Sequence, residues 1–172
     1  MKNLRITFLL FCSFLFISNV SNAQLEVAHL SMKGFSAIGL GGFLNVGIPI
    51  SEGAAITGEI GYYSFKHTGN QVILVPFLLG YRHTLNNTGS GIYLEPVLGY
   101  SIGATDITKA DYEEQKADGV TAGIGTGYIF PGRISFNLGL CYKHIFVSKD
   151  PSPNMFSLRI SHSFSFRKRD DY

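Results

Sequence analysis

Residues 75–83 read VPFLLGYRH, the most apolar run of the chain after its N-terminal segment. The run is too short for a helix that crosses a membrane, which needs about 20 apolar residues. Pro76 lies inside it, and a proline in a helix interior removes a hydrogen bond and clashes with the preceding turn. Turn-forming residues bound the segment at 66–70 and 86–89. We therefore interpret residues 71–83 as a β-strand.

The segments around this strand alternate between apolar residues and small or polar ones, which is the period of a β-strand. In residues 91–104, for example, Leu94 and Leu98 share one face, whereas Glu95 and Gly99 share the other. Each segment has about the length of a tilted membrane-spanning strand. The strands expected from this pattern are residues 35–48, 54–65, 71–83, 91–104, 119–130, 133–146 and 154–166.

The connections between these strands suggest an orientation. Residues 105–118 and 147–153 form long polar connections, whereas 49–53, 86–89 and 131–132 form short ones. Small bacterial outer-membrane barrels have short periplasmic turns and longer outer loops. The strand at 35–48 then starts outside, so residues 25–32 (LEVAHLSM), despite weak alternation, must form a strand that reaches it from the periplasm. The sequence therefore predicts an all-β fold, an eight-stranded antiparallel up-and-down transmembrane β-barrel.

The N-terminal segment has the pattern of a cleaved signal peptide. Lys2 and Arg5 precede an apolar stretch at 7–20, and small residues at 21–23 allow cleavage before Gln24. The predicted organisation is a signal peptide at 1–23 and an outer-membrane β-barrel domain at 24–172.

Composition excludes several function classes for the mature chain. Its single cysteine, Cys141, excludes an internal disulfide and a metal site built on clustered cysteines. Loss of Lys2 and Arg5 takes the formal charge from +2 to zero, whereas a nucleic-acid-binding protein needs a basic surface. A phosphate-binding glycine loop that ends in Lys-Ser or Lys-Thr is absent from the sequence, and so is H-E-x-x-H. We expect no cofactor, no catalytic residue and no metal site.

Charged residues inside the predicted strands fall on the less apolar face. A charge facing lipid costs several kcal/mol near the bilayer midplane, so we place these side chains in the lumen. Arg82 and Glu95 flank one turn at similar distances, which predicts that they are cross-strand neighbours. We interpret the set as an ion-pair network that plugs a narrow lumen; a selectivity or substrate site is the alternative. The predicted network consists of Glu59, Arg82, Glu95, Lys143 and Arg159.

The dipeptide Gly-Tyr recurs in the predicted strands, and its first three copies are spaced by 19 residues. That spacing is one strand plus one turn, so successive tyrosines fall at opposite ends of the barrel. The pattern predicts two aromatic girdles at the membrane interfaces. Pro76 cannot donate to a strand ladder, so we expect a bulge there that resets the facing of residues 77–82. Arg82 then faces the lumen only if the bulge is absent. The predicted girdle residues are Tyr62, Tyr81, Tyr100 and Tyr128.

His162 and Ser163 raise the possibility of a lipid hydrolase, because such enzymes use serine and histidine. Adjacent residues of a strand point to opposite faces, so these two side chains cannot easily form a nucleophile–base pair. We therefore expect that the protein is not an enzyme.

The pattern VPFLLGYR, its echo EPVLGY, the closing strand LRISHSFSF and the residues NAQ at the predicted cleavage site resemble the small outer-membrane β-barrel proteins of Bacteroidetes. Those proteins are similar in architecture to the eight-stranded OmpA/OmpX-type barrels. The resemblance implies a bacterial outer-membrane location, contact with membrane lipid and lipopolysaccharide, and assembly by the barrel insertion machinery. That machinery reads an aromatic-rich last strand, here Phe164 and Phe166; the tail at 167–172 departs from the family. The resemblance implies no biochemical activity.

These observations favour a non-enzymatic, monomeric outer-membrane protein with a structural, surface-interaction or envelope role. The alternatives are a porin-like small-solute channel, a soluble periplasmic lipid-binding barrel and a lipid A hydrolase. The soluble barrel would have its apolar face inside and its charged face outside, and glycine-rich faces with few charges make a poor soluble exterior.

Overall fold

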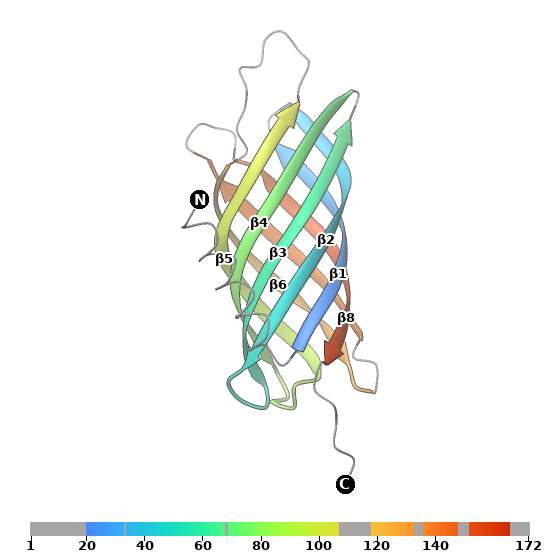
Figure 1. The fold of residues 1–172 in the computed structure, drawn as a ribbon, viewed down its shortest axis with the longest axis vertical. Coiled ribbons are helices and arrows are strands. Elements are labelled where there is room, and N and C mark those ends of the chain that lie inside the picture. The colour runs from blue at the N-terminus through green and yellow to red at the C-terminus, as the bar shows by residue number, and fades with distance from the viewer. Residues whose placement is uncertain are drawn as a thin grey trace, which may run out of the picture.

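The computed structural model describes residues 20–32, 34–67, 69–106, 118–132, 136–147 and 152–165. Each strand pairs antiparallel with the next, and β8 pairs with β1, so the sheet closes into a barrel (Figure 1). The predicted eight-stranded fold is confirmed. The strands are β1 Val20–Met32, β2 Phe35–Pro49, β3 Ala54–His67, β4 Asn70–Thr84, β5 Gly91–Asp106, β6 Gly119–Phe130, β7 Phe136–Phe146 and β8 Asn154–Ser165.

A strand at 25–32 was expected because the chain must reach the outer start of the strand at 35–48 from the periplasm. This strand is β1, and it begins at Val20. Its first four residues belong to the segment predicted as signal peptide, so cleavage before Gln24 would shorten β1; that cleavage stays a prediction. The described residues contain no helix able to span a membrane.

Strand pairing sets the tilt of the strands. A circuit of directly paired residues that leaves β1 at Ser21 returns to it at Ser31, a stagger of ten residues. Such a stagger tilts the strands by roughly 35–45° from the barrel axis, and the tilt is visible in Figure 1. The interior of an eight-stranded barrel is just wide enough for side chains to fill. The circuit is Ser21–Val46–Gly58–Leu79–Leu98–Ala122–His144–Asn154–Ser31.

The prediction of a bulge at Pro76 is wrong. The register between β3 and β4 is the same on both sides of it, and the ladder merely lacks two pairs, Gly61 with Pro76 and Tyr62 with Val75. On the other edge Pro76 pairs in register with Ser101. A shift by one residue would turn every following side chain to the other face and carry Arg82 into lipid, which costs more than one ladder hydrogen bond. Arg82 therefore faces the lumen, and Tyr81 faces outward.

The outer surface of the barrel is apolar. Large hydrophobic side chains face outward on every strand, among them Leu25, Ile38, Leu79, Leu98 and Leu140. The charged side chains of the strand interiors face the lumen instead, where they are buried or, for Arg82, partly buried. A soluble barrel needs the reverse arrangement, so the soluble lipid-binding alternative is wrong.

Glycine residues on the lumen face of β2 and β3 make room for aromatic rings. Each of three such glycines is paired across the strands with an aromatic residue. A Cβ added at Gly61 would lie 1.9 Å from the ring of Phe43. The small residues therefore let three rings lie across the interior of the barrel. The pairs are Gly39–Phe65, Gly41–Tyr63 and Gly61–Phe43.

Candidate functional site

The middle of the lumen holds six charged side chains that come from six strands. Three are carboxylates and three are cations, so their formal charges cancel. Five of them are buried, and Arg82 is partly buried, with 13% of its side chain exposed. The members of this ion-pair layer are Glu26 of β1, Glu59 of β3, Arg82 of β4, Glu95 of β5, Lys143 of β7 and Arg159 of β8.

Arg159 is the centre of the ion-pair layer. Its Nε donates to Oε1 of Glu26 at 2.7 Å, and its Nη2 donates to Oε2 of Glu59 at 2.8 Å. Its Nη1 lies 3.4 Å from Oε2 of Glu95. The three carboxylates belong to β1, β3 and β5, so one planar guanidinium reaches from its own wall across the lumen.

Lys143 occupies a second position in the ion-pair layer. Its Nζ donates to Oε1 of Glu59 at 2.9 Å and to Oη of Tyr63 at 3.0 Å, and it lies 3.7 Å from Oε2 of Glu26. Tyr63 Oη in turn donates to Oε2 of Glu26. The ammonium also lies 4.8 Å from the ring centre of Phe43, a favourable cation–π contact. The aromatic rings of β2 and β3 are thus part of the network.

Arg82 and Glu95 are cross-strand neighbours, as the sequence predicted. Arg82 Nη2 lies 2.9 Å from Oε2 and 3.1 Å from Oε1 of Glu95. Thr57 donates its hydroxyl to Oε1 of the same carboxylate at 2.8 Å. The guanidinium lies over the ring of Tyr93, 5.0 Å from its centre.

Removing charges from water is costly, and a buried ion pair offsets that cost only when its geometry is good and its remaining hydrogen bonds are made. In the ion-pair layer each carboxylate contacts a cation and each cation contacts a carboxylate. The layer therefore leaves no uncompensated charge among the described lumen side chains to attract a substrate ion. What it does is tie distant strands together and fill the cross-section of the barrel.

An apolar cluster fills the lumen on one side of the ion-pair layer. It lies toward the barrel end that carries the connections after β5 and β7, which we term the long-loop end. The sequence did not predict this cluster, because its residues occupy the lumen-facing positions expected to be polar. Its members are Ala28, Leu30, Met32, Phe35, Ala37, Phe43, Tyr63, Phe65, Val72, Leu74, Ile145 and Met155.

Polar side chains line the lumen toward the opposite, short-turn end. Gln24, Asn45 and Asn137 are buried. Both amide atoms of Gln24 and of Asn45, and Oδ1 of Asn137, have no hydrogen-bond partner among the described residues. Buried polar groups without a protein partner are normally bonded to ordered water. We therefore expect water to enter the lumen from the short-turn end as far as the ion-pair layer.

All five lumen charges singled out in the sequence meet in this layer, but Glu26 and Tyr63 were missed. Glu26 lies in the strand inferred from parity alone, so its facing was not considered. The cost of a charge on the lipid face would have placed it inside. Tyr63 follows the girdle candidate Tyr62, and its contact with Lys143 joins positions 80 apart in sequence.

The four girdle tyrosines all face outward, with exposed fractions of 47% for Tyr62, 44% for Tyr81, 47% for Tyr100 and 41% for Tyr128. Tyr62 and Tyr100 lie nearer the long-loop end of their strands, and Tyr81 and Tyr128 nearer the short-turn end. Exposed Ile102 lies beyond Tyr100, so the apolar surface continues past that ring. The girdle role stays a prediction.

The remaining sequence candidates do not form a site. His162 faces outward, and the side chains of Ser163 and Phe164 lie outside the described part of the chain, as do Phe166 and the tail at 167–172. Within the described ranges no group of three or more His, Cys, Asp or Glu could hold a metal ion.

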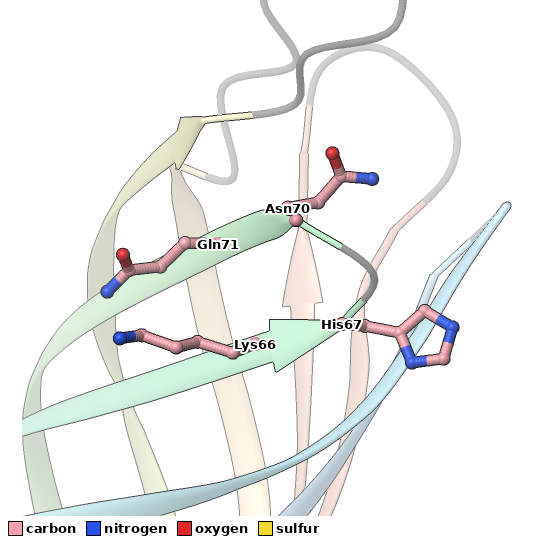
Figure 2. A pocket seen from close by; sticks show the side chains of 5 residues that line it. Lys66, His67, Asn70 and Gln71 are labelled. Atoms are coloured by element: carbon pink, nitrogen blue, oxygen red, sulfur yellow. The ribbon is translucent and has the colours of Figure 1, made fainter.

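A shallow hollow lies at the hairpin between β3 and β4, lined by Lys66, His67, Gly69, Asn70 and Gln71. Figure 2 shows that its side chains diverge: Lys66 and Gln71 extend to one side, whereas His67 extends to the other. Side chains that do not converge cannot surround one ligand group, so the hollow is a weaker candidate than the lumen.

Comparison with known proteins agrees with this geometry. Residues 16–164 match the family model described as outer membrane protein beta-barrel domain. A comparison with curated proteins finds no match. Three solved structures share the fold at low identity, which supports the architecture alone. Neisserial surface protein A has a TM-score of 0.69 at 19% identity, covering 86% of this chain and 96% of its own. Ail, the attachment invasion locus protein of Yersinia pestis, has 0.62 at 13%, covering 86% and 99%. The N-terminal barrel domain of Pseudomonas aeruginosa OprF has 0.55 at 17%, covering 86% and 98%.

Proposed function

The chain belongs to the outer membrane protein β-barrel domain family and is located in the bacterial outer membrane, and from that premise we propose that it is a sealed, non-enzymatic barrel with a structural or surface-contact role. The finer resemblance to the small Bacteroidetes barrels is part of this proposal. In it the protein is a monomer that is assembled by the barrel insertion machinery and surrounded by membrane lipid and lipopolysaccharide.

One observation carries the proposal: Arg159 contacts carboxylates on β1, β3 and β5 across the lumen. A binding or transport site needs unsatisfied groups that a ligand can engage, whereas here the charges engage one another. The apolar cluster toward the long-loop end adds a second layer, and apolar constrictions exclude ions by dewetting. The lumen is thus filled by side chains that bind one another, which suits a structural barrel rather than a pore.

The small-solute channel and the lipid A hydrolase are the surviving alternatives. A channel would need both layers to open together. A hydrolase would need a nucleophile beside a base, and Ser161, the described strand neighbour of the outward His162, is buried on the opposite face. We infer that activity, where the protein has one, lies in contacts made by its outer connections.

Two measurements on the purified full-length mature protein test this function. In planar bilayers we expect no ion conductance above the protein-free membrane, and steady single-channel openings would establish the channel instead. Mass spectrometry of lipid A incubated with the protein should show no loss of acyl chains. Deacylation that disappears in the double variant His162→Ala with Ser163→Ala would establish the hydrolase.

A further inference from the structure

A row of polar side chains crosses the lipid-facing surface of four adjacent strands. His144 on β7 pairs directly with Asn154 on β8, Asn154 pairs with Ser31 on β1, and Ser31 pairs with Ser36 on β2. All four residues face outward and are exposed or half-buried. They lie close to the long-loop end of their strands. We term this set the polar row.

Hydrogen bonds orient the polar row. Tyr142 donates its hydroxyl to Oδ1 of Asn154 at 2.6 Å, and Nδ1 of His144 lies 2.8 Å from the same oxygen. An amide oxygen only accepts, so Nδ1 of His144 carries the proton of that bond. Because both contacts end on Oδ1, the amide N–H groups of Asn154 point away from them. On β2, Ser36 is bonded to Nε2 of His29 at 2.9 Å.

The surface below the polar row is apolar. Below it, on the same strands, Val27, Ile38, Leu140 and Phe156 face outward and are exposed. Near the long-loop end the outward residues of β5 and β6 include Ile102 and Val120, which are apolar. Those of β3 and β4 include Ser64, Lys66 and Gln71, so the polar surface at this end of the barrel is interrupted at β5 and β6.

An amphiphile fits such a surface, with its headgroup on the polar row and its chains on the apolar residues below. Amide and hydroxyl donors suit phosphate oxygens and sugar hydroxyls, and imidazole N–H groups can donate as well. The outward residues of β1, β2, β7 and β8 in the described ranges include no carboxylate that would repel an anion.

We propose that the polar row binds the phosphate-bearing headgroup of an outer-leaflet glycolipid, the lipid A part of lipopolysaccharide. The acyl chains then lie along Val27, Ile38 and Phe156. This site deepens the proposed function, since it rests on the long-loop end facing the cell exterior. It gives the barrel a preferred lipid beside β7, β8, β1 and β2, which a uniformly apolar surface would not do.

The test is a native mass spectrometry titration of lipid A into detergent-solubilised mature protein. The site variant is Ser36→Ala with Asn154→Ala. The matched control is Ser64→Ala with Gln71→Ala, which removes an outward hydrogen-bonded pair of 3.2 Å on β3 and β4. We expect the site variant to bind lipid A about tenfold more weakly or worse, because one hydrogen bond to a charged group is worth about that factor. The control should bind as the parent protein does.

Equal binding by the site variant and the parent would overturn the proposal. If the site variant does not fold, a second experiment uses the parent protein alone. It compares the binding of lipid A, dephosphorylated lipid A and phosphatidylglycerol. We expect phosphorylated lipid A to bind tightest, and equal binding of all three would show contact with bulk lipid only. Failure of this site would leave the sealed barrel standing, because conductance and lipid A deacylation are measured independently.

Discussion

Arg159 on β8 and Glu59 on β3 form an ion pair of 2.8 Å although their strands are not neighbours in the sheet. β1 and β2 lie between them on one side of the barrel, so the pair crosses the lumen rather than bridging adjacent strands. Both side chains are almost completely buried. The stability of the barrel should therefore depend on this contact far more than on any exposed charge.

Replacing Arg159 by methionine should destabilise the barrel by about 3–5 kcal/mol, because the buried carboxylates of Glu26 and Glu59 lose their main partner. The free energy of unfolding is measured by urea titration in lipid vesicles, with the heat-dependent gel shift of folded barrels as the readout. Lys66→Met removes an exposed cation at the end of β3 and should change stability by less than about 0.5 kcal/mol. Similar effects of the two substitutions would mean that the ion-pair layer does not stabilise the fold.

Gly61→Ala should destabilise the barrel by about 1–3 kcal/mol, the usual cost of overpacking a filled interior. The added Cβ would lie 1.9 Å from the ring of Phe43, which Lys143 and Tyr63 hold in place. Gly42→Ala is the matched control, because Gly42 faces outward one position before Phe43 and has no atom within 4 Å of the added Cβ. The same urea titration compares them; a Gly61→Ala barrel as stable as Gly42→Ala would show that the ring moves freely.

Alternation along the chain was enough to predict six strands and their facing, whereas β1 was inferred from the need for an even number of strands and β4 from the turns that bound it. Glu95 and Leu98 could be assigned to opposite faces because each face of this barrel meets a different solvent, lipid or lumen. The same logic predicted that Arg82 and Glu95 meet. The prediction failed at Pro76, where a rule about single hydrogen bonds was given more weight than the cost of turning Arg82 toward lipid.

What alternation could not show is how the lumen is divided along its axis. Leu30, Phe65 and Leu74 occupy lumen-facing positions, yet they are apolar, so their facing alone does not reveal that they cluster. These residues come together because of the ten-residue stagger that one circuit of paired residues around the barrel produces on β1. That stagger follows from the pairing of all eight strands and not from any single segment. For the same reason the contact of Lys143 with Tyr63 could not be read from local spacing.

Loss of the ion-pair layer alone should not open the barrel. Arg159→Gln disrupts the layer, but Leu30 and Leu74 still close the lumen toward the long-loop end, and such apolar constrictions exclude ions by dewetting. In planar bilayers we expect this variant to remain silent. Adding Leu30→Ser and Leu74→Ser should produce openings. Steady conductance from Arg159→Gln by itself would show that the charges are the sole seal.

Water in the lumen should reach Ser161 but not Cys141. Both side chains are buried by protein, with 3% and 2% exposed, and both face the lumen. Ser161 pairs with Asn137, in the layer whose amide atoms need water, whereas Cys141 lies deeper, one outward-facing residue from Lys143. A membrane-impermeant thiol reagent should label Ser161→Cys, made in a Cys141→Ser background, roughly tenfold or more faster than native Cys141, whose labelling requires local opening. Mass spectrometry of the folded mature protein gives both rates, and equal protection of the two thiols would mean that the lumen is dry from end to end.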